Sequence, residues 1–161
     1  MPRTLRWFGL AGLIVILDRV TKAIVLDSFV PGESRVVTGF FNLVLVFNKG
    51  AAFSFLASAP GWQTAVFATV AVVAATVISV LIFRNTNNGI FCGGLGLILG
   101  GALGNLYDRL VYGEVVDFLD FHAAGWHWPA FNVADAAITV GAGILIAEGF
   151  MHREEARGKG A

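Results

Sequence analysis

Two aspartates in the second half of the chain are the residues best suited to acid–base chemistry. Asp117 lies in the segment VVDF, and Asp135 lies in FNVAD, 18 positions later. The chain between them is expected to be a loop that begins and ends at one membrane face, which lets the two carboxylates meet. Adjacent carboxylates do not both ionise easily, so one pKa rises while the other stays low. Such a pair can hold a water molecule, one member taking its proton while the other donates to a carbonyl.

Each aspartate also has a purely structural interpretation. Asn132 is placed to cap a helix in which Asp135 is the third residue, where a carboxylate favours the helix dipole without any catalytic role. Asp117 and Asp120 can equally be solvated acids of a loop. Against these interpretations, an ionisable group at the mouth of a membrane span is seldom idle. The pattern alone leaves both possibilities open.

A polar stripe is predicted on the helix that precedes Asp117. Gly101, Asn105 and Arg109 recur at i, i+4 and i+8, which places an amide and a guanidinium on one face. Arg109 is suited to bind a carboxylate or a peptide carbonyl. The alternative is an ion pair between Arg109 and an acid near it in the sequence, namely Asp108, Glu114 or Asp120.

Other chemistries have weaker support. His122 and His127 lie near acids, but the segment supplies no third fixed ligand, so we expect no metal site there. A Ser54/Lys49 dyad rests only on closeness in sequence, and we discount it. The single cysteine, Cys92, cannot form an intrachain disulfide and is expected to be a small buried residue.

The composition indicates the elements that must position these residues. Hydrophobic residues make up 57% of the 161 and charged residues 14%, against about 45–50% and about 25% in soluble domains. The apolar residues form four blocks long enough to cross a bilayer, at about 7–26, 61–83, 89–109 and 132–151. The zero net charge provides no basic field for nucleic acid. We therefore expect one mainly α membrane domain over residues 1–161, a bundle of four transmembrane helices.

The first block is unusual because it contains Asp18, Arg19 and Lys22. Charges are costly inside a membrane, so these side chains must face protein or water. Asp18 and Lys22 are spaced i, i+4 and can neutralise each other inside the bundle. A cleaved signal peptide is the competing interpretation, but the charges interrupt the apolar stretch and no small-x-small cleavage site follows it, so we expect the block to be retained.

Glycines and basic residues predict packing and orientation. Gly96, Gly100 and Gly104 are spaced four apart, which leaves one flank of the third block bare for close helix contact. Four spans place both termini on one side. Six Lys and Arg residues lie on that side against three in the other two connections, so we expect cytoplasmic termini. The segment at about 33–56, which is rich in Val and Phe, then forms a small β-sheet on the periplasmic side, and residues 110–131 form a periplasmic loop.

Five motifs together resemble lipoprotein signal peptidase, the bacterial signal peptidase II family. They are LDRVTK at 17–22, FNKGAAFSFL at 47–56, GGALGNLYDRL at 100–110, VVDF at 115–118 and FNVADAAITVG at 131–141. The resemblance covers nearly the whole chain in order. It implies an aspartyl endopeptidase of the bacterial inner membrane that cleaves prolipoproteins just before a cysteine bearing a diacylglyceryl group, with the active site toward the periplasmic face and no cofactor or metal.

The resemblance also implies roles for individual residues. The catalytic dyad falls on Asp117 and Asp135, the pair already indicated by topology. Further positions match polar residues that line the family's site or form its first-helix pair, and the family's small outer sheet cradles substrate. Those positions are Asn48, Gly50, Asn105, Arg109, Asn132, Asp18 and Lys22. Arg19 and Lys49 lie between the motif positions, and we assign them no role.

Two other classes of function remain as alternatives. A four-span proton-coupled transporter would use Asp18 or Glu148 as its carrier carboxylate, but the acids gather at one face rather than at mid-membrane. A non-enzymatic assembly protein would leave the polar stripe unexplained. The expected partners are diacylglyceryl-modified prolipoproteins and membrane lipids.

Overall fold

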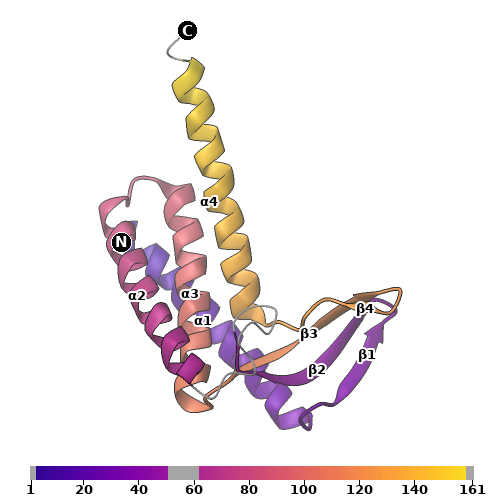
Figure 1. The fold of residues 1–161 in the computed structure, drawn as a ribbon. Coiled ribbons are helices and arrows are strands. Elements are labelled where there is room, and N and C mark those ends of the chain that lie inside the picture. Colours follow the sequence, from indigo (N-terminus) through magenta and orange to yellow (C-terminus); the bar gives the residue numbers. More distant parts are fainter. Residues whose placement is uncertain (1–2, 51–61, 159–161) are drawn as a thin grey trace.

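The computed structural model describes residues 3–50 and 62–158, and within them it contains four helices and one antiparallel sheet (Figure 1). The helices are α1 (Arg3–Ser28), α2 (Trp62–Arg84), α3 (Gly89–Val111) and α4 (Val133–Gly158). The strands are β1 (Ser34–Thr38), β2 (Phe41–Asn48), β3 (Val115–Ala123) and β4 (Trp126–His127), paired in the order β1-β2-β3-β4. The predicted fold class, a helical membrane bundle with a small sheet, is confirmed.

Three helices of the described chain are long and apolar enough to cross a membrane: α2, α3 and the Val133–Met151 part of α4. Helix α1 is not among these three because it contains several charged residues. Its outer face is nevertheless apolar. Leu13, Ile16, Val20 and Ile24 are each more than half exposed on that face. Asp18 and Lys22 instead point inward and are fully buried. α1 is therefore a fourth helix of the bundle with an apolar outside and a charged inside.

Helix α3 lies at the centre of the bundle, and its glycines set the distance to its neighbours. A Cβ on Gly96 would lie 3.1 Å from the Trp7 carbonyl oxygen, and a Cβ on Gly100 would lie 2.7 Å from that of Ala11. Gly101 is in similarly close contact with the backbone of α4 at Ala134. The predicted role of the glycine flank in close helix packing is confirmed, and the bare flanks of α3 serve two neighbours.

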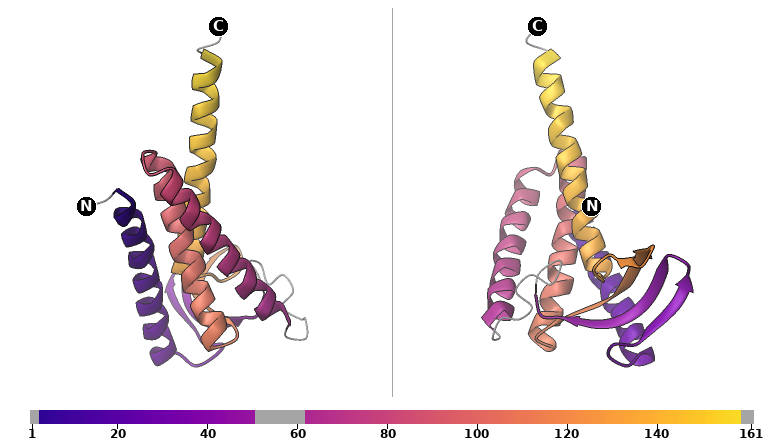
Figure 2. Two further views of the ribbon diagram at one scale, coloured as in Figure 1. Left: turned by 90° about the vertical axis from the view of Figure 1, so that its left-hand side faces the viewer. Right: turned by 45° about the vertical axis from the view of Figure 1, so that its right-hand side comes forward.

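The two ends of the bundle differ (Figures 1 and 2). The first turn of α1, the α2–α3 connection and the last turns of α4 lie at one end, where α4 extends beyond the other helices. The sheet projects from the opposite end, next to the start of α4. This agrees with the expectation that both termini share a side. Cys92 is buried in α3, as expected.

The sheet extends further than the sequence analysis predicted. The hairpin of β1 and β2 confirms the strand prediction for the described part of the 33–56 segment, of which residues 51–56 lie outside the described residues. The expected loop at 110–131 instead contains β3 and β4, joined by a turn with positive φ at Ala124 and Gly125. β3 is the longest strand and pairs along all of β2. Buried Val116 and Phe118 of β3 pack with Leu45 of β2 and Val25 of α1, which attaches the sheet to the bundle.

Candidate active site

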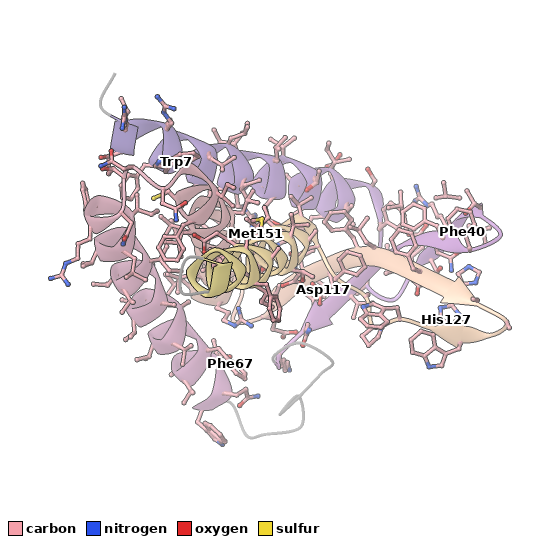
Figure 3. The ribbon with its side chains drawn as sticks, turned by 90° about the horizontal axis from the view of Figure 1, so that it is seen from above. Trp7, Phe40, Phe67, Asp117, His127 and Met151 are labelled. Atoms are coloured by element: carbon pink, nitrogen blue, oxygen red, sulfur yellow. The ribbon has the colours of Figure 1, made fainter. Side chains whose placement is uncertain are left out.

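Asp117 lies on β3 where the sheet meets the helices, as seen from above in Figure 3. Its side chain is buried, with 2% of the residue exposed. The Asn132 side-chain amide donates to Oδ1 of Asp117 over 2.7 Å, and the Asn48 amide donates to Oδ2 over 3.0 Å. Both carboxylate oxygens are therefore oriented by neutral amide donors, so Asp117 is not the solvated loop acid of the alternative interpretation.

Asp135 is in the first turn of α4. Its backbone N–H donates to Asn132 Oδ1 over 2.9 Å, which confirms the prediction that Asn132 caps this helix. Its carboxylate Oδ1 accepts a 2.7 Å hydrogen bond from the side-chain amide of Asn105 on α3. The helix cap is thus compatible with a pairing of Asp117 and Asp135, because Asn132, which caps α4, also orients Asp117.

Lys22 fixes the direction of the amide hydrogen bonds between the two aspartates. Its Nζ lies 3.1 Å from Asn105 Oδ1, and the Asn132 amide donates to the same oxygen over 3.2 Å. An ammonium group only donates, so the Asn105 oxygen faces Lys22 and its NH₂ group faces Asp135. Asn105 and Asn132 therefore each present a donor to one carboxylate of the pair.

The surroundings of Asp117 make it bind a proton more tightly than an ordinary carboxyl group does. Burial, reinforced by the negative charge of Asp135, raises the pKa of Asp117 to about 7. Hydrogen bonds from Asn48 and Asn132 and the charge of Lys22 act in the opposite direction without cancelling the rise. Asp117 therefore retains a proton close to neutral pH, as a proton donor in acid–base catalysis must.

A buried cluster of charged residues on α1 and α3 lies next to the site. Its members are Asp18, Arg19, Lys22 and Asp108. Lys22 Nζ lies 2.8 Å from Asp18 Oδ2 and 2.7 Å from Asp108 Oδ2, and Arg19 also pairs with Asp108. The predicted neutralisation of Asp18 by Lys22 is confirmed. Asp108 was not predicted as a member of this cluster, and Arg19 was assigned no role. A lysine placed within a bundle core beside a single acid would have been the signal to search for a second acid on α3.

The same cluster connects the elements that carry the dyad. Asp18 Oδ1 accepts the backbone N–H of Ala134 over 3.0 Å at the start of α4. Asp108 Oδ2 accepts the backbone N–H of Val116 over 3.2 Å in β3. Asp117 follows Val116 and Asp135 follows Ala134, so each buried acid fixes the backbone directly before one member of the dyad.

Arg109 does not form the ion pair that the sequence analysis offered as an alternative, so that interpretation is wrong. Among the described residues, Asp108 pairs with Lys22, Glu114 with Lys49 and Asp120 with His127. The Arg109 guanidinium donates to the Gly50 carbonyl over 3.1 Å and to the Asn105 carbonyl over 3.3 Å, and it lies over the Phe67 ring. Arg109 thus holds the backbone that follows β2 next to the dyad.

His127 lies apart from Asp117, toward the far end of the sheet (Figure 3). Asp120 pairs with His127, and His122 is the neighbour of His127 across β3 and β4. Asp120 is buried and accepts hydrogen bonds from the Asn42 amide and His127 Nδ1, each over 2.9 Å. The interpretation of Asp120 as a solvated loop acid is therefore wrong. Burial opposes ionisation, but these hydrogen bonds and the His127 charge hold the pKa of Asp120 below its usual value. Within the described residues no group of three acidic, His or Cys side chains is placed to hold a metal.

An open groove of about 200 Å³ leads to Asp117. It runs between the end of β2 and the segment that follows β4. Its lining residues are Val46, Phe47, Asn48, Lys49, Asp117, Pro129 and Ala130. A peptide in this groove would reach the buried carboxylate from the outside of the bundle.

Comparisons with known proteins agree with this site. Residues 10–151 match the family model described as signal peptidase (SPase) II. The chain is 59% identical over 140 residues to the lipoprotein signal peptidase of Ralstonia nicotianae, covering 87% of this chain and 81% of the relative. It is 57% identical over 144 residues to that of Cupriavidus necator, covering 89% and 82%.

Two solved bacterial membrane enzymes share the fold. One has a TM-score of 0.84 and 29% sequence identity over 93% of this chain and 90% of its own. The other has a TM-score of 0.78 and 30% identity over 89% and 91%. Fold, length and sequence thus agree over most of the chain, which belongs to the signal peptidase II family of aspartic peptidases.

Proposed function

We propose that this protein is a membrane aspartyl endopeptidase that removes signal peptides from prolipoproteins by cutting just before a diacylglyceryl-modified cysteine. One observation carries the proposal. Asp117 and Asp135 come from different elements, are electrostatically coupled and are each oriented by an amide, and Asp117 lines a groove. Membership of the signal peptidase II family supports the substrate class. The chain acts as a single membrane domain over residues 1–161 and needs no cofactor.

The chemistry follows from the two environments. Asp135, in its ionised form, accepts a proton from a water molecule, whose oxygen attacks the carbonyl carbon of the scissile peptide bond. Asp117, protonated near neutrality, donates its proton to the carbonyl oxygen. The tetrahedral intermediate then collapses as one of its hydroxyl groups returns a proton to Asp117 and re-forms the C=O bond. The C–N bond breaks, and the proton held by Asp135 passes to the amine of the departing cysteine. Asn48, Asn105 and Asn132 keep the two carboxylates oriented throughout.

The surrounding residues support the dyad in different ways. Arg109 holds the Gly50 backbone against the site, and Asp18 and Lys22 fix the start of α4. The two candidates for a transporter's carrier carboxylate already have partners: Asp18 is paired with Lys22, and Glu148 accepts a hydrogen bond from Asn88 over 2.5 Å. These contacts favour a structural role for both acids over proton transport.

The active site is proposed to face the periplasm, with the protein in the bacterial inner membrane. The lipid anchor of the substrate then stays in the bilayer while the scissile bond is held at a fixed depth, which raises its effective concentration at the dyad. Each acyl methylene kept in hydrocarbon contributes about 0.8 kcal/mol of anchoring. Anchoring precedes the encounter, so lipid specificity must come from contacts with the modified cysteine.

The test is cleavage of one prolipoprotein, with and without its diacylglyceryl group, by the purified protein in one bilayer composition. We expect cleavage of the modified form before the cysteine and at least about tenfold slower cleavage of the unmodified form. Equal rates would contradict lipid recognition and leave a general membrane protease. No cleavage of either form by a folded, inserted protein would contradict the proposed function as a whole.

A further inference from the structure

Among the described residues that line the groove beside Asp117, one charged residue, Lys49, has no role in the proposed mechanism. The walls of the groove are apolar at Val46, Phe47, Pro129 and Ala130. Among the lining residues that the structure describes, Lys49 is the only cation. The other polar residues of the lining are Asn48 and Asp117, so Lys49 is a single positive charge in the groove that contains the Asp117 carboxylate. A peptide that occupies this groove would lie against Lys49, which suggests a role in selection among substrates.

The backbone next to Lys49 is held by hydrogen bonds on both sides, while its side chain is exposed. The Asn48 side chain bridges Asp117 and the Gly50 N–H, and the Gly50 carbonyl accepts from Arg109. The Lys49 side chain itself is 57% exposed, and its Nζ lies 3.5 Å from Glu114 Oε1. Lys49 thus presents an exposed positive charge from a backbone segment that is fixed by hydrogen bonds.

The pair with Glu114 is easily exchanged for another carboxylate. The buried Lys22 makes ion pairs of 2.7 and 2.8 Å, whereas Lys49 and Glu114 are further apart and solvated. Exposed pairs of this kind contribute little to stability, so breaking one to form another costs little. Glu114 pairs with the Lys49 ammonium group in this structure, so it would compete with the carboxylate of a substrate for Lys49.

Lys49 acts on the groove and not on the ionisation of the dyad. Lys22, and not Lys49, is the cation among the main causes that set the pKa of Asp117. A loss of Lys49 should therefore leave the pH profile in place. Any effect of Lys49 on cleavage then comes from the substrate that lies in the groove.

We infer that Lys49 is a specificity-determining residue that favours prolipoproteins carrying an acidic side chain close to the scissile bond. The inference rests on the proposed function and specifies the substrate class of the same site. An acidic peptide side chain fits better than a lipid phosphate. The groove lies on the sheet side of Asp117, between β2 and the segment after β4, where the scissile peptide must pass.

The experiment compares matched Asp and Asn substrates, since these residues have nearly the same shape and differ in charge. The two variants are made in one diacylglyceryl prolipoprotein, at each of the two residues before the cleaved bond and at the residue after the cysteine. At one of these positions we expect the intact protein to favour Asp by about 2- to 5-fold in kcat/KM. The Lys49→Ala variant should bring this ratio to about one, Lys49→Arg should retain it, and Glu114→Gln should increase it.

Arg35 provides a matched control. It lies on β1, outside the groove lining, with 53% of its side chain exposed and its own carboxylate partner in Glu33. The Arg35→Ala variant should keep the ratio of the intact protein. The pH profile of Lys49→Ala should also match that of the intact protein.

Three results would overturn the inference. They are an Asp/Asn ratio of one in the intact protein at every position, an unchanged ratio in Lys49→Ala, and a Lys49 effect that follows the anionic lipid content of the vesicles instead of the peptide. All three leave the proposed function standing, because the Asn substrates are still cleaved. Failure of the intact protein to cleave any of these substrates would instead contradict the proposed function.

Discussion

At the residue scale, strand β2 presents two asparagines that each donate to an aspartate of β3. Asn48 donates to Asp117 in the site, and Asn42 donates to Asp120 outside it. The same amide–carboxylate contact thus occurs once inside the site and once outside. This repetition gives a matched pair for separating an effect on chemistry from an effect on the sheet.

The first prediction concerns the pH dependence of cleavage. Asp117 must be protonated to donate, so activity should fall as the pH rises through its pKa of about 7. The hydrogen bond from Asn48 lowers that pKa, so Asn48→Ala should move the alkaline limb of the kcat/KM profile to higher pH. Asn42→Ala should leave the limb in place. A shift of the Asn48→Ala limb to lower pH, or equal shifts in both variants, would contradict this assignment.

The second prediction concerns the dyad itself. Asp117→Asn and Asp135→Asn should each lower kcat by about 10²–10⁴-fold or more, because an amide neither accepts the proton of water nor shares one with its partner. Asp120→Asn is the control, since it alters an acid three positions along the same strand but outside the site. Chelators should not change the rate. Near-normal cleavage by either dyad variant would contradict the mechanism.

At the element scale, packing of α1 against α3 positions the buried ionic cluster. Gly100 allows the approach, because its missing Cβ would lie 2.7 Å from both the Ala11 carbonyl oxygen and Ile14 Cβ. Gly104, one turn further along α3, leaves room for the Asp18 carboxylate. Close helix contact and charge burial therefore depend on the same glycine flank.

The third prediction follows from that contact. Gly100→Ala should push the helices apart and lower the free energy of unfolding by about 1–3 kcal/mol, as overpacking does. Gly12→Ala on α1 is the control, because a Cβ there has no neighbour within 4 Å, and alanine should raise helix stability by up to about 1 kcal/mol. The measurement is Tm in detergent for the two variants and the parent. Equal Tm values for all three proteins would show that the glycine flank is not under steric constraint.

At the scale of the whole molecule, the basic residues at the helix ends, Arg3, Arg6 and Arg84, lie at the end opposite the sheet. The first turn of α1, which contains Arg3 and Arg6, and the last turn of α2, which contains Arg84, are at the end away from the sheet (Figures 1 and 2). By the positive-inside rule, the more basic end is expected in the cytoplasm, and this orientation would place the sheet, Asp117 and Asp135 on the periplasmic side. The structure shows which elements lie at each end of the bundle, and the positive-inside rule predicts which end faces the cytoplasm.

The fourth prediction tests that orientation. In a Cys92→Ala background, a cysteine at Ala124 in the β3–β4 turn should react with a membrane-impermeant thiol reagent on intact spheroplasts. A cysteine at Asn87 in the α2–α3 connection should react only after the membrane is opened. Both positions are exposed, so accessibility in the protein itself does not separate them. The reverse labelling pattern would invert the proposed topology. Ser58, a further periplasmic position by the same reasoning, lies outside the described residues.

The sequence by itself determined the features that depend on composition and short spacing. Four apolar blocks predicted the helices, since a bilayer span requires a long uncharged segment. Asn132 and Asp135 predicted a helix start, and the i, i+4 spacing of Asp18 and Lys22 predicted their ion pair, because neighbours within one helix follow from its pitch. Topology and motif resemblance both indicated Asp117 and Asp135 as the pair.

Only the tertiary structure decided the contacts between elements. The sequence predicts a loop where β3 lies, and the burial of Asp117 and Asp120 in this strand becomes favourable only when amides of β2 and Asn132 satisfy them. Asp108 joins Lys22 and Arg19 because the glycine flank brings α3 against α1. Arg109 binds the backbone carbonyl of Gly50, and the spacing of side chains in the sequence cannot predict a contact with the backbone. Charges in a low-dielectric interior need partners, but which partners they find depends on faces that meet only after the helices have packed.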